Sequence, residues 1–272
     1  MNPRKSLFCL FLLIFMFFYI PAIYAGTVPQ FTIMTEEWEP YNFQEDGVVK
    51  GISSDLLVLI LERIGSSQGR KDIQVLPWAR GYRDIQNIPD TLLFSTARTK
   101  ERENMFKWVG PIFEIDFFIY ALRSRNIKIS SFEDLRKYKI GTLRCDVVED
   151  MLIINTGMKI SDFEQVSLNI SNTKKLSLGR VDLIAQSEDT TIYTCMEAGI
   201  DPDEFEPVFT LGKANMYYAF HKETPDSVIT MFQTAFDDIH NEGKLAEIYN
   251  NYVKKGQRGQ EAQSGQISTI DK

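Results

Sequence analysis

SDLLVLILERI, at residues 54–64, has the composition of a helix that is buried over most of its surface. Ser54 is a preferred residue at a helix N-cap, Asp55 suits the positive end of the helix dipole, and Gly65 stands where a helix commonly ends. A helix with this many apolar side chains is too hydrophobic to lie on a protein surface. We therefore expect it to pack on a β-sheet.

Short apolar segments on either side of this helix predict the strands of that sheet. QFTIMT (residues 30–35) precedes the helix, and IQVL (73–76) and TLLF (91–94) follow it. PWARGYRDIQN (77–87) separates the last two and is interpreted as a non-strand segment. Strand–helix–strand repetition at this spacing indicates an α/β sheet.

The same alternation starts again near residue 120 and predicts a second α/β unit. Ser130 and Glu133 have the spacing of a capping box for a short helix over residues 131–138. The elements expected after it are strands at 140–143, 181–185 and 216–220, and helices at 147–156, 191–199 and, in two pieces, 225–253. A chain of 272 residues, 44% of them apolar, is long enough to bury two such cores.

The two ends of the chain differ in composition from the rest. Arg4 and Lys5 precede the apolar run LFCLFLLIFMFFYI (residues 7–20), and small residues end at Ala25, which is the pattern of a secretory signal peptide. We expect cleavage after Ala25 and export to the periplasm. A membrane anchor is the alternative, although a spanning helix needs about 20 apolar residues. Residues 255–272 are polar and are expected to form a disordered tail.

Charge and rare residue types exclude several classes of function. The net charge is −7, and no cluster of Lys and Arg is dense enough to follow a phosphate backbone, so nucleic-acid binding is not expected. With only His221, His240 and three cysteines available, we expect no metal site and no cofactor. A disulfide between Cys145 and Cys195 is left open. The motifs of nucleotide-binding loops, serine hydrolases and zinc proteases are absent from the sequence.

Residues typical of binding sites follow the predicted strands, where open α/β sheets receive their ligands. Aromatic faces combined with arginines and hydroxyls suit a small anionic or zwitterionic solute, because a guanidinium binds a carboxylate through two hydrogen bonds. Buried core aromatics and surface arginines are the alternative interpretation. The residues concerned are Trp38 and Tyr41 after the first strand, Trp78, Arg80 and Tyr82 after the second, and Ser95, Thr96, Arg98, Thr99 and Arg102 after the third.

Several longer blocks occur in an order that resembles the family 3 periplasmic solute-binding proteins, which deliver polar amino acids to ATP-driven importers. The resemblance runs from about residue 31 to residue 252 and so covers nearly the whole chain after the expected signal peptide. The blocks are EPYNFQEDGVVKGISSDLLVLILERIG (39–65), TARTKERENMFKWVGPI (96–112), KIGTLRCDVVEDML (139–152), GRVDLIAQSEDTTIY (179–193) and YYAFHKETPDSVITMFQTAFDDIHNEGKLAEIYNNYV (217–253).

This resemblance implies the type II periplasmic-binding-protein fold, in which two α/β lobes are joined by two strands and the ligand lies in the cleft between them. Lobe 1 would comprise residues 27–119 and 215–254, and lobe 2 residues 120–214. The implied protein is a monomer whose partners are a small solute and an ABC permease.

The resemblance also implies roles for individual residues. Trp38 stands where the family stacks an aromatic ring on the ligand, and Arg102 stands where an arginine grips its α-carboxylate. Asp146 lies in the loop where a helix N-terminus caps that carboxylate. Ser187 replaces the aspartate that pairs with the ligand ammonium, so either Glu188 takes this role or the ligand is not an ordinary amino acid. The full set of predicted ligand-binding residues is Trp38, Tyr41, Trp78, Arg80, Thr96, Arg102, Asp146, Ser187 and Glu188.

The expected function is therefore capture of a small polar, carboxylate-bearing solute for an ABC importer by lobe closure, without enzymatic activity. One alternative is a sensory protein that reports a ligand to a membrane receptor. Another is a dehydratase-like enzyme in which Glu37 or Glu188 serves as the catalytic carboxylate. Adjacent acids such as Glu36 and Glu37 are otherwise interpreted as a solvent-exposed pair.

Overall fold

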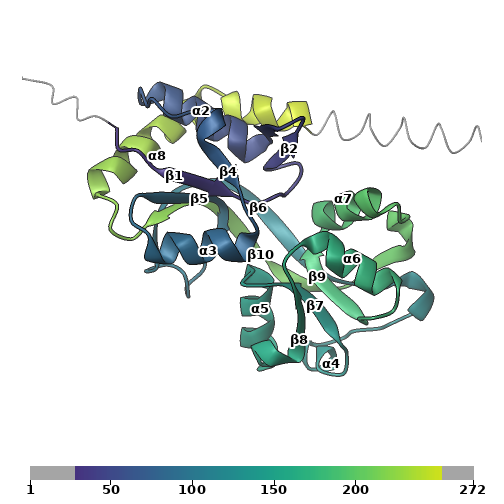
Figure 1. Ribbon diagram of the computed structural model, residues 1–272. Helices are drawn as coiled ribbons and strands as arrows, with labels where there is room; N and C mark the ends of the chain where they lie inside the picture. Colours follow the sequence, from purple (N-terminus) through teal and green to yellow (C-terminus); the bar gives the residue numbers. More distant parts are fainter. Residues whose placement is uncertain (1–27, 253–272) are drawn as a thin grey trace, which may run out of the picture.

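One mixed sheet runs through the whole molecule in the computed structural model, which describes residues 28–252. Its strands lie in the order β4-β1-β5-β10-β6-β9-β7-β8, and Figure 1 shows them divided between two lobes. The expected signal peptide and the expected tail both lie outside the described residues. The strands of the sheet are β1 (Thr32–Thr35), β4 (Ile73–Val75), β5 (Thr91–Ala97), β6 (Phe106–Leu122), β7 (Ile140–Leu143), β8 (Phe163–Val166), β9 (Leu183–Ser187) and β10 (Phe205–His221), with β2 (Phe43–Glu45) and β3 (Val48–Lys50) forming a separate hairpin.

The two long strands β6 and β10 connect the lobes. They are antiparallel to each other along their whole length, from Phe106 opposite His221 to Leu122 opposite Phe205. The last part of β10 pairs with β5, whereas the last part of β6 pairs with β9. We call the part built on β1, β4 and β5 the first lobe and the part built on β7, β8 and β9 the second lobe (Figure 1). The residue limits expected for the lobes stay a prediction.

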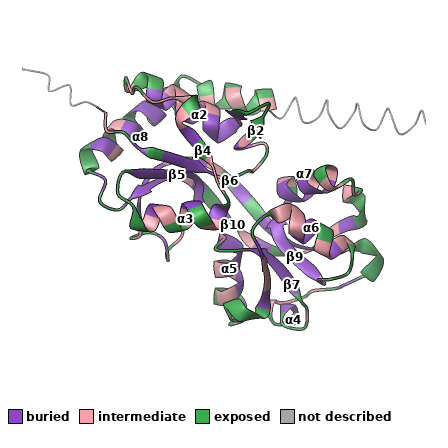
Figure 2. Cartoon of the chain, viewed as in Figure 1, coloured by how far each residue is buried: buried purple, intermediate pink, exposed green. Residues whose placement is uncertain are grey.

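Helices cover both faces of the sheet in each lobe, because successive strand residues point to opposite faces. In the first lobe, Leu92 packs with α2 and α8 on one face and Leu93 packs with α3 on the other. In the second lobe, α5 lies on one face, and α6 and α7 lie on the other. Figure 2 shows the buried residues along the strands. The helices are α2 (Ile52–Arg63), α3 (Trp78–Asn87), α4 (Phe132–Leu135), α5 (Val147–Thr156), α6 (Asn169–Ser177), α7 (Glu188–Ala198) and α8 (Asp226–Asn241); residues 244–252 are also helical, and short 3-10 turns lie at Arg70–Asp72, Arg123–Arg125, Ile160–Asp162 and Pro202–Glu204.

The helix that decides the fold is buried as expected but begins earlier. α2 starts at Ile52, and its N-cap is Gly51, so the prediction of Ser54 as the cap is wrong. Gly51 has φ 115°, and a Cβ atom there would lie 2.4 Å from the Tyr41 carbonyl oxygen, so only glycine fits. Ser54 is buried in the first turn instead.

Other local predictions need correction. The capping box is formed by Ser131 and Asp134, one position after the expected Ser130 and Glu133. Residues 78–87 form helix α3, although no helix was expected there; the helix begins directly after Pro77, which needs no hydrogen-bond donor. No strand was expected at β6, because Gly110 and Pro111 resemble a strand break in the sequence. β10 extends far beyond the strand expected at residues 216–220.

Cys145 and Cys195 are free cysteines, so the disulfide that was left open does not form. Cys145 is exposed and Cys195 is buried. Within residues 28–252, no helix is both long and apolar enough to span a membrane, and no cluster of potential metal ligands occurs.

Candidate ligand-binding cleft

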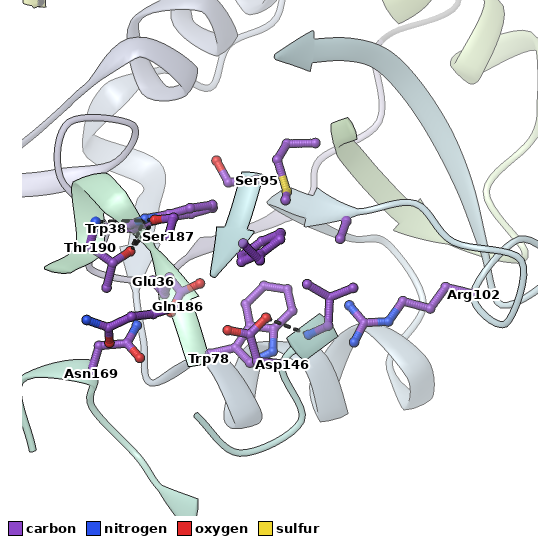
Figure 3. Close-up of a pocket in the computed structure, with 14 residues that line it drawn as sticks. Glu36, Trp38, Trp78, Ser95, Arg102, Asp146, Asn169, Gln186, Ser187 and Thr190 are labelled. Atoms are coloured by element: carbon purple, nitrogen blue, oxygen red, sulfur yellow. Dashed lines mark hydrogen bonds between the residues drawn. The ribbon is translucent and has the colours of Figure 1, made fainter. Parts of the chain in front are cut away.

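A narrow cavity lies between the two lobes and receives side chains from both (Figure 3). The carboxyl ends of β1, β5 and β9 and the N-terminal ends of α3, α5, α6 and α7 meet there, which is where open α/β folds bind their ligands. The lining residues are Glu36, Trp38, Trp78, Ser95, Ala97, Arg102, Phe117, Asp146, Val147, Asn169, Gln186, Ser187, Thr190 and Met216.

Two tryptophans of the first lobe form part of the wall and reach the second lobe. The Trp38 indole nitrogen donates a hydrogen bond to Thr190 Oγ1 at 2.9 Å. The Trp78 indole nitrogen donates one to the Cys145 carbonyl oxygen, also at 2.9 Å. Each ring therefore lines the cavity and also holds the two lobes together.

Arg102 brings a buried positive charge to the cavity. Its side chain is only 2% exposed, and its Nη2 donates to Asp150 Oδ2 at 2.8 Å and to the Cys145 carbonyl oxygen at 3.2 Å. Its Cζ lies 4.7 Å from the centre of the Tyr82 ring. Arg102 Nε and Nη1 are buried and have no hydrogen-bond partner, so part of this guanidinium is free to bind another group.

Two acidic residues line the same cavity from opposite lobes. Asp146 is the N-cap of α5, and its carboxylate accepts a hydrogen bond from the Val147 amide. Burial raises the pKa of Asp146 to about 6, although Arg102 and the Val147 amide act against this shift. Burial also raises the pKa of Glu36 well above its usual value, and the Asp146 charge adds to this effect. Both carboxylates thus lie where a negative charge is poorly solvated.

Ser187 begins α7 and uses its hydroxyl within the protein. Its Oγ accepts a hydrogen bond from the Thr190 amide at 3.2 Å and is hydrogen-bonded to Thr190 Oγ1 at 2.8 Å. The neighbouring Gln186 donates from Nε2 to Thr191 Oγ1 at 3.0 Å, but its Oε1 is buried without a partner. Gln186 Oε1 is therefore an unused polar atom at this end of the cavity.

Of the predicted site residues, the structure brings Trp38, Trp78, Arg102, Asp146 and Ser187 to the cavity and leaves the other four away from it. Tyr41 lies behind Trp38, stacks on Phe113 and donates to Asp189 Oδ2 at 2.6 Å. Thr96 is fully buried, with its hydroxyl donating to the Leu93 carbonyl oxygen. Arg80 is exposed on α3, 3.7 Å from Asp84, and Glu188 is exposed on α7.

Several cavity residues were not predicted from the sequence. Glu36 was interpreted as part of an exposed pair, yet it lines the cavity, whereas Glu37 is exposed. Asn169 was missed because α6 was not expected. Gln186 and Thr190 flank the predicted Ser187, and their position at a strand end before a helix is the signal that could have identified them.

A second hollow of about 200 Å³ adjoins the first and shares Glu36, Trp78 and Asn169 with it. Much of its remaining wall is apolar and includes Val75, Leu76 and Leu143.

Two α/β lobes that enclose a polar cavity define a solute-binding protein of the periplasmic type. Residues 31–255 match the family described as bacterial extracellular solute-binding proteins, family 3, and the chain belongs to this family. The resemblance noted in the sequence is thus confirmed.

Solved structures share the fold over most of their length, as three examples show. A histidine kinase sensor domain with similarity to periplasmic binding proteins has a TM-score of 0.72 and 16% identity, over 82% of this chain and 95% of that one. The substrate-binding protein of an amino acid ABC transporter has a TM-score of 0.69 and 14% identity, over 83% and 100%. An ancestral amino acid-binding protein, a precursor of cyclohexadienyl dehydratase, has a TM-score of 0.63 and 15% identity, over 82% and 94%.

At these identities the structures establish the fold, and they confirm the expected type II periplasmic-binding-protein architecture. No curated protein matches the sequence.

Proposed function

We propose that this protein is exported to the periplasm, captures a small polar, carboxylate-bearing solute by closing its lobes, and delivers it to an ABC permease. Membership of the extracellular solute-binding family supports this function, as does the similarity to the binding protein of an amino acid transporter. The solute class is an amino acid or a chemically related molecule.

The observation that carries the proposal is the state of Arg102. A guanidinium that is 2% exposed and has two donor atoms without partners is costly unless a ligand completes its hydrogen bonds. A carboxylate matches the planar arrangement of these donors and can accept two hydrogen bonds at once. The rings of Trp38 and Trp78 in the same cavity provide contact surface for the rest of the solute.

Closure follows from the distribution of these residues between the lobes. Arg102, Trp38 and Trp78 belong to the first lobe, whereas Asp146 and Gln186 belong to the second. A solute that contacts both sets binds the closed form more tightly than the open form, and this difference in affinity drives closure. The permease would then recognise the closed form.

Two other functions use the same cleft. A sensory role is the second candidate, supported by the similarity to a histidine kinase sensor domain. Neighbouring genes for a permease and an ATPase would favour transport over sensing. An enzymatic role finds less support, because Glu188, one of the two carboxylates considered for it, is exposed outside the cavity, and Glu37 reaches only the second hollow.

The proposal is tested by thermal unfolding of the purified protein with a panel of amino acids and small organic acids. At a solute concentration of 100 times Kd, binding stabilises the native state by about 2.7 kcal/mol. Arg102→Ala should abolish the stabilisation, whereas Arg80→Ala, an exposed arginine outside the cavity, should leave it unchanged. If Arg102→Ala does not fold, Arg102→Lys keeps the charge without the planar donors. Equal stabilisation of wild type and a folded Arg102 variant would contradict the proposal.

A further inference from the structure

At the end of the cavity away from Arg102, several side chains carry hydrogen-bond acceptors. In Figure 3, Glu36, Asn169 and Gln186 lie on the side away from Arg102, and Asp146 lies between the two sides. Gln186 Oε1 and Asn169 Oδ1 are buried without a partner. Gln186 is 3% exposed, so its carbonyl oxygen has little access to water. Unpaired buried acceptors that line a cavity favour a ligand that donates hydrogen bonds.

The titratable groups around this end are mostly acidic. Glu36 extends from the first lobe just after β1, and Asp146 extends from the second lobe at the start of α5. Within the described residues, no basic side chain forms an ion pair with Glu36. Arg102 is the nearby cation, and its Nη2 is engaged by a third carboxylate, Asp150. When both carboxyls are ionised, they repel each other on closure unless something positive lies between them.

Resting on the solute-capture function above, we propose that Glu36 and Asp146 together bind a positively charged N–H group of the solute, while Arg102 binds its anionic group. The carbonyl oxygens of Gln186 and Asn169 accept further hydrogen bonds from the same cation. Recognition of the cation therefore lies between the two lobes at the start of α5, and not at Ser187, whose hydroxyl is used to cap α7.

This arrangement defines the chemical class of the solute. The cation must carry N–H groups, such as an ammonium or a guanidinium, because a quaternary ammonium has no hydrogens to satisfy the unpaired acceptors. The solute must also carry an anion at a distance that lets it reach Arg102. Since the pair of carboxylates is split between the lobes, the cation also favours closure by relieving their repulsion.

The experiment measures binding by calorimetry for wild type, Glu36→Gln, Asp146→Asn and the control Glu188→Gln. Both cavity variants keep the size of the side chain, and asparagine also caps helices well, so folding is expected to be retained. Solutes are tested as matched sets: an amino acid, its N-trimethylated form, and the corresponding acid without nitrogen.

We expect wild type to bind the amino acid and to bind the other two members of its set at least about 30-fold more weakly, as for loss of a buried charge partner. Glu36→Gln and Asp146→Asn should each weaken binding of the amino acid by a similar factor, with Glu188→Gln unchanged.

The inference is overturned if the nitrogen-free acid binds as tightly as the amino acid, or if both cavity variants bind the amino acid like wild type; binding that still depends on Arg102 would leave the proposed function intact. A solute that binds through Glu36 and Asp146 but independently of Arg102 would support the cation site and contradict the carboxylate anchor. Absence of binding by every solute in the panel would count against both.

Discussion

Arg102 in the loop after β5 and Asp150 in α5 form an ion pair between the lobes, with Nη2 and Oδ2 2.8 Å apart. The two partners differ in exposure: the arginine side chain is 2% exposed and the aspartate side chain 38%. The pair joins the lobes, and Arg102 Nε and Nη1 stay buried without partners beside the cavity. Arg102 thus serves both interlobe contact and the proposed carboxylate binding.

Asp150→Asn should therefore favour the open form of the ligand-free protein. Loss of the charge leaves the buried guanidinium without its acidic partner, at a cost of about 1–3 kcal/mol to the closed form. Small-angle scattering should show a larger radius of gyration for the ligand-free variant. The control Glu62→Gln changes an exposed acid of α2 and should scatter like wild type. An unchanged radius for Asp150→Asn would show that this ion pair does not hold the lobes together.

Tyr41→Phe should weaken solute binding without removing any part of the cavity wall. The Tyr41 hydroxyl donates to Asp189 Oδ2 at 2.6 Å, and this bond joins the first lobe to α7 of the second. A typical hydrogen bond contributes about 0.5–1.5 kcal/mol, so Kd should rise by about 2- to 12-fold. Calorimetry measures this change, with Tyr138→Phe as a control away from the cavity. A loss of binding far beyond this range would instead indicate that Tyr41 contacts the solute.

The sequence predicted the strand–helix alternation and the residues at strand ends, and the predicted site residues include five of the fourteen that line the cavity. Trp38, Asp146 and Ser187 each lie at the end of a strand or the start of a helix, where local sequence signals are strong. Two of the predicted residues lie outside the cavity because of the periodicity of the element that carries them. Arg80 is two positions after Trp78 on an unpredicted helix, which turns it by about 200° around the axis.

The alternation of side chains along a strand explains why Thr96 does not line the cavity. Ser95 and Ala97 line the cavity, and Thr96 between them points to the opposite face of β5. A sequence pattern that places three consecutive residues in a loop cannot assign their faces. Glu36 was missed for a different reason. In the sequence, an acid beside another acid resembles a solvent-exposed pair, and only the fold shows that Glu36 is buried near Asp146 of the second lobe.

The stability difference between Asp146→Asn and wild type should depend on pH. Burial raises the pKa of Asp146 in the folded protein to about 6, from an ordinary value of 3.8, against the lowering effects of Arg102 and the Val147 amide; Glu149 and Asp150 raise it further. A raised pKa means that the folded state binds more protons than the unfolded state between these two values. The contribution of Asp146 to stability is thus fully present below about pH 4 and is lost as the pH rises through 6.

Asparagine does not titrate, so the unfolding free energy of Asp146→Asn relative to wild type should increase between pH 4 and pH 7. Denaturant unfolding of both proteins at several pH values measures this difference. A constant difference across the range would mean that the pKa of Asp146 is not raised in the folded protein.

Gln186→Leu should stabilise the ligand-free protein and weaken solute binding. Gln186 Oε1 is buried without a partner, and leucine of similar size removes this cost, for a gain of about 1 kcal/mol. Thr191 Oγ1 loses the bond from Gln186 Nε2 but still donates to the Ser187 carbonyl oxygen. Gln165 is the matched control, because its Nε2 donates to Glu149 Oε1 at 2.7 Å and Gln165→Leu should be destabilising. Thermal unfolding and calorimetry on both variants test the contrast: a Gln186→Leu protein that is less stable than wild type, or that binds the solute equally well, would show that the Gln186 carbonyl oxygen has no part in binding.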